Sequence, residues 1–303
     1  MKIAVVLNGI SFRKDVFYKK YLPDLLYEHT VDVYETRTQY EGIAHARRAV
    51  DKRYDVILAA GGDGTLNHVI NGVVEGRERY LDLPVIGIIP LGSGNDFARG
   101  LNLHEQGRDK LLKLLREFKP RRIDVGKVHY VDNKSGLIDS SYFINVVDIG
   151  MGPVVVQKVT DSDRLFGSAV AYYTSILSTF FSYSPMMVEV TTPHWTWKDK
   201  ARSLAFTIGK YYGHGLCIAP DAKQDDGIFS AFLCGNVSVL DFILCTGKLK
   251  RGDKIELPQV SYKDATHIEL KSEHTCLIEA DGEILGQLPA TIEMTEIELK
   301  FLY

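Results

Sequence analysis

The pattern of hydrophobic and polar positions differs between the first 120 residues and the rest of the chain. Over the first 120 residues, short apolar runs alternate with segments whose apolar residues recur every three or four positions. This alternation of strand-like and helix-like segments predicts a doubly wound, mostly parallel sheet with helices on both faces. The expected strands are 2–8, 31–36, 56–60 and 85–89, and the expected helices are 18–27, 42–53, 110–118 and two that begin at residues 66 and 96.

After residue 122 the pattern becomes that of successive strands. Apolar and polar residues alternate in short runs up to the end of the chain, which predicts a mostly antiparallel β domain with one inserted helix over 165–183. We therefore expect an α/β protein with a first domain over 1–122 and a second over 123–297. The runs that predict strands are 123–131, 141–150, 186–192, 203–212, 227–234, 267–272, 276–283 and 290–303.

Composition, charge and cysteine spacing count against several classes of protein. Apolar residues make up 45% and charged residues 25% of the chain, which is usual for a soluble globular protein. The net charge of -3 counts against binding to a polyanion, so no nucleic acid partner is expected. The four cysteines lack the spacing of a disulfide framework or a thiolate zinc site. The N-terminal segment lacks a signal-peptide core, so we expect a cytoplasmic protein, peripheral to a membrane at most.

One uncharged stretch, Leu165–Val188, is long enough to span a bilayer. It is rich in hydroxyl side chains and is interrupted by Gly167 and Pro185, so it is too polar for a membrane span. Its apolar residues at helical spacing are Val170, Tyr173, Leu177 and Phe181. We expect a helix that packs on the sheet, and contact with a membrane or a lipid is the alternative.

A glycine-rich turn follows the third expected strand. It consists of Gly61, Gly62, Asp63, Gly64 and Thr65. Glycines at the end of a parallel strand let backbone N–H groups approach an anion, and the helix expected to follow favours negative charge. This pattern predicts a phosphate site, with a plain tight turn as the alternative. Since a carboxylate repels phosphate unless a divalent cation lies between them, Asp63 also indicates Mg²⁺.

A second strand, turn and helix follow directly. Here Gly92 and Gly94 free the backbone, Ser93 offers a hydroxyl group, and Asn95 or Asp96 can cap the next helix. We expect both glycine turns to face one cleft. Helix capping without ligand contact remains the alternative for Asn95 and Asp96.

The two turns together resemble a known family. GGDGTLN at 61–67 and PLGSGNDFARGL at 90–101 are similar to the catalytic domain of diacylglycerol kinases, sphingosine kinases and their soluble bacterial relatives. NAD kinases and phosphofructokinases are similar around GGDG but lack the second motif. The resemblance implies an α/β domain completed by residues 298–303, a β-sandwich-like second domain, and ATP between them. Further segments that carry it are 123–126, 143–145, 150–152, 219–222, 225–227 and 281–283.

The resemblance also implies roles for individual residues. The implied ATP contacts are Thr36, Gly61, Gly62, Asp63, Gly64, Thr65, Leu66, Asn67, Ser93 and Asn95. The implied Mg²⁺ ligands are Lys223, Asp226 and Ile228, the last through its carbonyl. Glu283 matches the proton acceptor, with Asp281 as the other candidate, and Asp63 would organise metal. Taken alone, Asp226-Gly227 and Asp281-Gly282 also fit type I′ hairpin turns, whereas Glu283 has no such explanation.

The chain departs from the family pattern at three places. The first loop reads Asn8-Gly9 where the family usually has Asn-Pro, which leaves its contact with phosphate open. His68 stands where glutamate is common, and Ser93 replaces threonine but keeps the hydroxyl group. Phosphoryl transfer requires neither of the groups that the changes at His68 and Ser93 remove.

The sequence therefore predicts an ATP- and Mg²⁺-dependent kinase that phosphorylates a lipid hydroxyl, of diacylglycerol or a related lipid, through peripheral contact with a membrane. The first alternative is a small-molecule kinase of the NAD-kinase or phosphofructokinase type. The second is a nucleotide-sensing protein that binds ATP without turnover. The identity of the lipid and the oligomeric state, a homodimer included, are left open.

Overall fold

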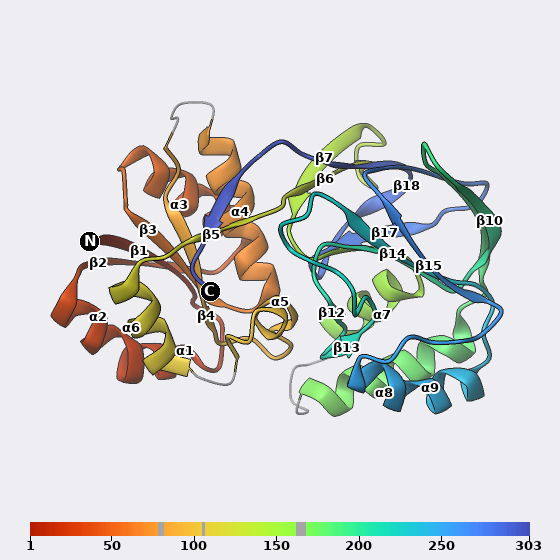
Figure 1. The fold of residues 1–303 in the computed structure, drawn as a ribbon, viewed down its shortest axis with the longest axis horizontal. Coiled ribbons are helices and arrows are strands. Elements are labelled where there is room, and N and C mark those ends of the chain that lie inside the picture. Colours follow the sequence, from red (N-terminus) through yellow and green to blue (C-terminus); the bar gives the residue numbers. More distant parts are fainter. Residues whose placement is uncertain (78–81, 105–106, 162–167) are drawn as a thin grey trace. The chain divides into compact units, whose positions relative to one another are not determined.

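A computed structural model of the chain describes residues 1–77, 82–104, 107–161 and 168–303 (Figure 1). The chain divides into two compact units. Unit 1 contains Met1–Ile123 and Ile297–Tyr303, and unit 2 contains Asp124–Glu296. Each unit has its own sheet and its own hydrophobic core.

The sheet of unit 1 has six strands in the order β2-β1-β3-β4-β19-β5. Its strands are β1 (Lys2–Asn8), β2 (Thr30–Thr36), β3 (Val56–Gly61), β4 (Val85–Pro90), β5 (Arg121–Ile123) and β19 (Leu299–Phe301). Neighbouring strands are parallel except for the pair of β19 and β5. The interiors of β1 and β3 are buried throughout, which explains their uninterrupted apolar sequences.

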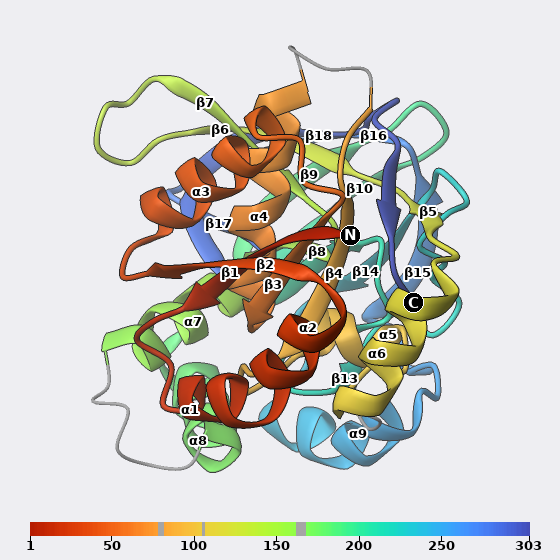
Figure 2. The same cartoon turned by 90° about the vertical axis from the view of Figure 1, so that its left-hand side faces the viewer.

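Helices cover both faces of this sheet (Figure 2). They are α1 (Lys14–Val16), the π-helix η1 (Phe17–Tyr21), α2 (Leu22–Glu28), α3 (Gln39–Asp51), α4 (Asp63–Gly76), α5 (Asp96–Gly100) and α6 (Gly107–Glu117). Leu25 of α2 and Leu115 of α6 belong to one core cluster with Leu7 and Leu58 of the sheet. Helices α3 and α4 lie against the opposite face. The predicted doubly wound arrangement is confirmed.

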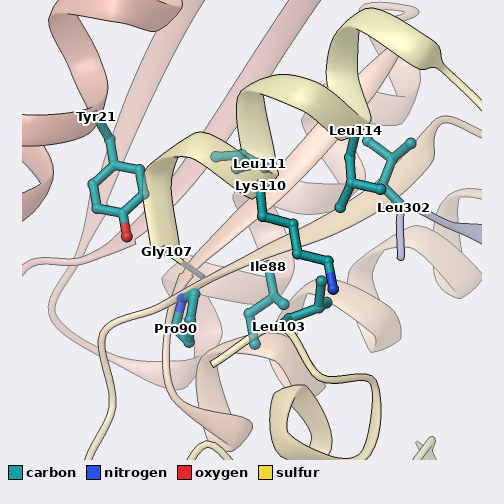
Figure 3. A pocket seen from close by; sticks show the side chains of 9 residues that line it. All are labelled: Tyr21, Ile88, Pro90, Leu103, Gly107, Lys110, Leu111, Leu114 and Leu302. Atoms are coloured by element: carbon teal, nitrogen blue, oxygen red, sulfur yellow. The ribbon is translucent and has the colours of Figure 1, made fainter. Parts of the chain in front are cut away.

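The packing of α6 against β4 leaves a small cavity (Figure 3). Its volume is about 10 Å³, and it is lined by residues that include Tyr21, Ile88, Leu111 and Leu302. A cavity of this size holds about one water molecule, so it is too small to be a nucleotide site.

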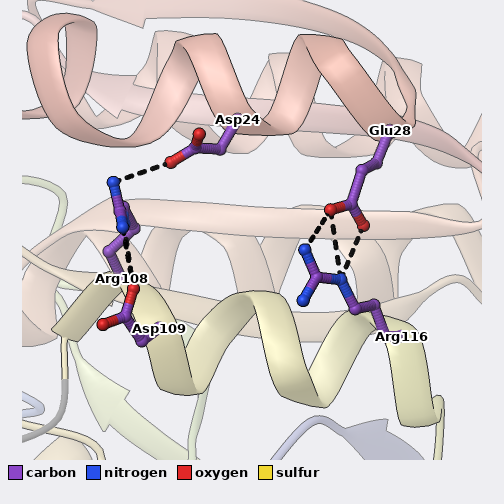
Figure 4. Close-up of polar contacts among 5 residues, drawn as sticks. All are labelled: Asp24, Glu28, Arg108, Asp109 and Arg116. Carbon is purple, nitrogen blue, oxygen red and sulfur yellow. Dashed lines mark hydrogen bonds and ion pairs between the residues drawn. The ribbon is translucent and has the colours of Figure 1, made fainter.

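Two sets of ion pairs join α2 to α6 (Figure 4). The Arg116 Nε atom lies 3.1 and 3.0 Å from the two carboxylate oxygens of Glu28, and the guanidinium holds the pKa of Glu28 below its usual value. Arg108 lies 3.1 Å from Asp24 and 3.0 Å from Asp109. Because exposed pairs add little stability, the apolar contacts beneath them hold the two helices.

The main sheet of unit 2 has eleven strands, and every pair in it is antiparallel. Its strands are β6 (Gly126–Val131), β7 (Ile138–Phe143), β8 (Val146–Gly150), β9 (Met186–Thr191), β10 (Thr196–Ala201), β11 (Ser203–Thr207), β14 (Phe229–Cys234), β15 (Val260–Ala265), β16 (His267–Ser272), β17 (Leu277–Ala280) and β18 (Glu283–Met294). Two short strands, β12 (Tyr211–Tyr212) and β13 (Leu216–Cys217), form a separate pair. The predicted antiparallel β domain is confirmed.

The described part of unit 2 also contains three helices where the sequence predicted one. They are α7 (Met151–Asp161), α8 (Ser168–Ser182) and α9 (Val239–Arg251). Residues 165–167 of the predicted helix lie outside the described part of the chain. The predicted apolar stripe is wrong at its end, because α8 buries Ile176 and Phe180 while Phe181 is 80% exposed. Among the residues that the structure describes, no helix is long and apolar enough to cross a bilayer.

Candidate functional site

The two glycine turns of unit 1 contact each other. The N–H groups of Leu91 and Gly92 donate to the Gly61 carbonyl at 2.8 and 3.1 Å. A Cβ atom added at Gly92 would lie 2.4 Å from the Cα atom of Gly62, so this approach requires glycine. The two turns therefore form one continuous backbone surface at the ends of β3 and β4.

Helix α4 begins at Asp63, three residues earlier than predicted. Asp63, Gly64 and Thr65 thus belong to its first turn, where backbone N–H groups lack intrahelical partners and the helix end is positive. An anion can bind there. Leu66 differs, because its N–H group donates to the Gly62 carbonyl at 3.1 Å and its side chain lies in the core. This geometry argues against the predicted contact of Leu66 with ATP.

The Asp63 carboxylate caps helix α5. Its two oxygens accept hydrogen bonds from the N–H groups of Asp96 and Phe97, both at 3.0 Å. Burial and the neighbouring Asp96 carboxylate raise the pKa of Asp63 to about 6, although both hydrogen bonds oppose this rise. Asp63 therefore links the first glycine turn to the helix that follows the second.

Asn95 occupies the N-cap position of α5, but its side chain makes no capping hydrogen bond to the helix. Its side chain instead closes the second turn, where Oδ1 accepts from the Gly92 N–H at 3.0 Å and Nδ2 donates to the Gly92 carbonyl at 2.9 Å. The φ angle of Asn95 is 52°, a left-handed conformation that asparagine tolerates better than most residues. Asn95 thus fixes the shape of the turn.

The other predicted ATP contacts in unit 1 differ in exposure. Thr36 is buried, and its hydroxyl group donates to the Leu7 carbonyl at 3.3 Å. Thr65 and Asn67 are also buried, whereas Ser93 is exposed. Ser93 is therefore the accessible hydroxyl group among these four residues.

Arg13 also lies at the glycine turns, and the sequence analysis did not single it out. Its Nη1 atom lies 3.3 Å from the Gly92 carbonyl. The loop that carries it follows β1 and is held by a 2.8 Å hydrogen bond from the Gly9 N–H to the Thr36 carbonyl. An arginine in a loop after a parallel strand was the available signal, since guanidinium groups suit phosphate.

In unit 2, Asp281 and Gly282 connect β17 to β18. Their φ angles are 49° and 88°, and positive values at both positions are what a type I′ turn requires. Asp226-Gly227 does not fit the same turn, because only Gly227 has a positive φ angle.

The Asp281 carboxylate stabilises the backbone at residues 144–146. It is 3% exposed and accepts three backbone hydrogen bonds of 2.9–3.0 Å. The donors are the N–H groups of Ile144, Asn145 and Val146. Glu283, the first residue of β18, is only half-buried. Of the two candidate proton acceptors, Glu283 is therefore the more accessible.

Asp148 and Glu279 form a buried acidic pair that the sequence analysis missed. They are directly opposite on β8 and β17, and both are fully buried. The hydroxyl groups of Ser203 and Tyr212 donate to Asp148 at 3.0 and 2.8 Å. The Glu279 Oε2 atom accepts from the Gly282 N–H at 2.9 Å, which ties the pair to the turn before Glu283.

Burial dominates the electrostatics of this pair. It raises the pKa of Asp148 to about 7, and together with the Asp148 charge it holds the pKa of Glu279 well above its usual value. The titratable groups that interact electrostatically with the pair are Tyr183, Tyr212, Cys234, Cys276 and Asp281.

We expect this pair to make stability depend on pH. A carboxyl group whose pKa is raised by folding binds more protons in the folded state, so the free energy of unfolding falls as pH rises above about 4. Each group contributes at most about 1.4 kcal/mol per pH unit, for Asp148 up to its pKa of about 7. Glu279→Gln keeps the acceptor for Gly282 but cannot ionise. The free energy of unfolding of this variant should therefore fall less steeply than that of the wild type as pH rises. Urea unfolding from pH 4.5 to 8.5 measures this, and equal pH slopes for both proteins would contradict it.

The predicted Mg²⁺ ligands lie on one loop of unit 2. Lys223, Asp226 and Ile228 are exposed, and Asp226 Oδ1 accepts from the Ile228 N–H at 3.2 Å. Asp124 holds the loop through two 2.7 Å hydrogen bonds, from its N–H to the Gln224 carbonyl and from the Gly227 N–H to its carboxylate. If Lys223 and Ile228 contribute their backbone carbonyls beside the Asp226 carboxylate, the donors are all oxygen, which fits Mg²⁺.

Two family models match this chain. Residues 2–128 match the diacylglycerol kinase catalytic domain, and residues 145–303 match the YegS C-terminal NAD kinase beta sandwich-like domain. A diacylglycerol kinase of Staphylococcus saprophyticus subsp. saprophyticus is 30% identical over 297 residues, covering 95% of this chain and 91% of that protein.

Two solved structures share the fold. A diacylglycerol kinase from Bacillus anthracis has a TM-score of 0.71 at 20% identity, covering all of this chain and 96% of its own. Yeast NADH kinase in complex with NADH has a TM-score of 0.52 at 10% identity, covering all of this chain and 83% of its own. These similarities confirm the predicted fold class.

Proposed function

The chain belongs to the diacylglycerol kinase catalytic-domain family, and from this premise we propose that it transfers the γ-phosphoryl group of ATP to a lipid hydroxyl, with diacylglycerol as the first candidate. The observation that carries the proposal is the contact between the two glycine turns. Phosphoryl transfer asks a protein mainly for positioning and charge stabilisation, which backbone N–H groups beside a helix N-terminus provide.

In this proposal unit 1 holds ATP. The first turn of α4 would bind phosphate through the N–H groups of Asp63, Gly64 and Thr65, and Ser93 would add a hydroxyl group. Asp63 would keep the two turns in register and would help to organise the metal of the nucleotide.

Unit 2 would supply the proton acceptor and a metal site. Glu283 would take the proton of the attacking hydroxyl, because Asp281 is occupied by three backbone hydrogen bonds. The carbonyls of Lys223 and Ile228 and the carboxylate of Asp226 would hold Mg²⁺. Bound Mg²⁺ would supply a fixed positive charge that orders this loop.

Arg13→Ala should raise the KM for ATP roughly five- to tenfold, because a charge-assisted phosphate contact contributes about 1–1.5 kcal/mol. Steady-state kinetics at varied ATP concentration measure the change. Arg108→Ala is the matched control, since this guanidinium also belongs to unit 1 but pairs with Asp24 and Asp109. Equal KM values for Arg13→Ala and Arg108→Ala would remove Arg13 from the proposed site.

The acceptor is identified by incubating the protein with Mg²⁺, labelled ATP and a total lipid extract. A labelled lipid phosphate, identified by mass spectrometry, is the expected product. Label transfer to NAD in a parallel incubation that contains NAD in place of the lipid extract would establish the small-molecule kinase. ATP binding without any transfer would favour a nucleotide sensor.

A further inference from the structure

Helix α9 (Val239–Arg251) is firmly terminated at both ends. At its start, the Ser238 hydroxyl accepts from the Asp241 N–H and the Asp241 carboxylate accepts from the Ser238 N–H, both at 3.1 Å. At its end, Gly252 adopts a φ angle of 81°. These caps define where α9 begins and ends.

The inner face of α9 packs on unit 2. Phe242, Cys245 and Leu249 are spaced at i, i+3 and i+7 and belong to one hydrophobic cluster. The Phe242 ring lies 4.8 Å from the Phe180 ring of α8, and the two helices run side by side (Figure 1). The opposite side of α9 consequently faces solvent.

This outer face begins with large apolar side chains. Leu240, Ile243 and Leu244 are 63%, 52% and 68% exposed, at positions where a surface helix normally carries polar residues. Phe181 of the adjacent α8 is also exposed. Apolar side chains gathered on a surface indicate a binding partner.

The same helix ends in positive charge. Lys248, Lys250 and Arg251 lie in its last turn, and its one acidic residue, Asp241, belongs to the N-terminal cap. Arg251 pairs with Asp253 just beyond the helix at 2.9 Å, so this end keeps a net positive charge although the chain as a whole is slightly negative. Apolar residues followed by basic residues along one helix are typical of helices that lie in the interface of an anionic membrane.

We propose that the outer face of α9, formed by Leu240, Ile243, Leu244, Lys248 and Arg251, docks onto an anionic membrane surface. The inference rests on the proposed function, since a diacylglycerol acceptor resides in a bilayer. It places the membrane contact on α9, whereas the sequence analysis considered only the helix that became α8. The three apolar side chains would enter the headgroup region, and the cationic end would meet lipid phosphates.

Vesicle co-sedimentation tests the apolar part of this surface. With vesicles of phosphatidylglycerol and phosphatidylcholine, combining Leu240→Ser, Ile243→Ser and Leu244→Ser should lower binding at least tenfold. The matched control combines Leu137→Ser and Ile138→Ser, since these residues of unit 2 are equally exposed but lie near the β6–β7 turn. Because all these side chains are exposed, both variants should keep the wild-type melting temperature.

The charge part has its own test. Combining Lys248→Gln with Arg251→Gln should reduce binding to the anionic vesicles on the order of tenfold and flatten its salt dependence. Binding to pure phosphatidylcholine vesicles should hardly change. An unchanged salt dependence would contradict the assigned role of the two cations.

Two outcomes would overturn the proposal. In the first, the apolar triple variant and its control bind vesicles equally well. In the second, the triple variant leaves vesicle binding intact but dissociates a wild-type dimer in analytical ultracentrifugation, which would make α9 an interface between copies of the chain. Phosphorylation of a short-chain diacylglycerol in detergent micelles tests the proposed function without requiring the protein to dock onto a bilayer. Wild-type protein that fails to phosphorylate it refutes the proposed function, whereas docking alone predicts equal micelle rates for the triple variant and wild type.

Discussion

Replacing Glu283 by Gln should lower kcat by roughly 10² to 10⁴ while leaving the fold and the affinity for ATP almost unchanged. Glutamine keeps the size and the hydrogen-bonding shape of glutamate but cannot accept a proton. The type I′ turn accounts for Asp281 and Gly282, and it gives no reason for a half-buried carboxylate at the next position. A general base supplies that reason.

The matched control is Glu293→Gln, the same substitution on the same strand. Glu293 lies near the other end of β18 and pairs with His129 at 3.3 Å, so its loss should leave kcat within a few-fold of wild type. Initial rates at saturating ATP and acceptor measure both variants. Equal rates for the two variants would refute the role of Glu283, and weaker ATP binding with unchanged kcat would place Glu283 on the metal of the nucleotide.

Asp63→Ala should both destabilise unit 1 and lower kcat/KM for ATP by at least about 100-fold. The substitution removes the acceptor of two 3.0 Å hydrogen bonds at the start of α5, which should cost about 1–3 kcal/mol. It also releases the second glycine turn from the first, so the backbone N–H groups lose their alignment for phosphate. Asp63→Asn keeps one acceptor and should give an intermediate loss.

Asp241→Ala is the control that distinguishes a loss of folding stability from a loss of ATP binding. Asp241 also caps a helix, α9 of unit 2, so its removal should cost similar stability but leave ATP affinity unchanged. Denaturant unfolding and ATP titration calorimetry provide the two measurements. A folded Asp63→Ala protein with wild-type affinity and activity would show that the glycine turns do not need this carboxylate.

The first domain could be predicted from sequence because its buried strands are uninterrupted apolar runs between glycine turns. The predicted helix start at Leu66 is late, because Asp63 and Gly64, which indicate a turn, lie in the first turn of α4. Helix α9 was missed for a different reason. Its outer face carries Leu240, Ile243 and Leu244, so apolar residues lie on both sides and the helical period disappears. Helix α7 contains the β-branched run Val154–Val156, which resembles a strand.

The candidate site was predictable where its residues are adjacent in sequence. The two glycine turns and the Asp281-Gly282-Glu283 turn are local motifs. The hydrogen bonds of the Asp63 carboxylate were not predictable, because no local sequence pattern indicates that this side chain contacts the start of α5. The Asp148–Glu279 pair depends on the register between β8 and β17, and Arg13 depends on the path of a loop.

The most direct test of the proposed function is phosphate transfer from γ-labelled ATP to dioctanoylglycerol in detergent micelles with Mg²⁺. The wild-type protein should form labelled dioctanoyl phosphatidic acid in proportion to time and enzyme. Glu283→Gln should form at most about one-hundredth as much, and Glu293→Gln should match wild type to within a few-fold. If the wild-type protein releases no more ADP with the lipid than without it and forms no labelled lipid, it is not a diacylglycerol kinase.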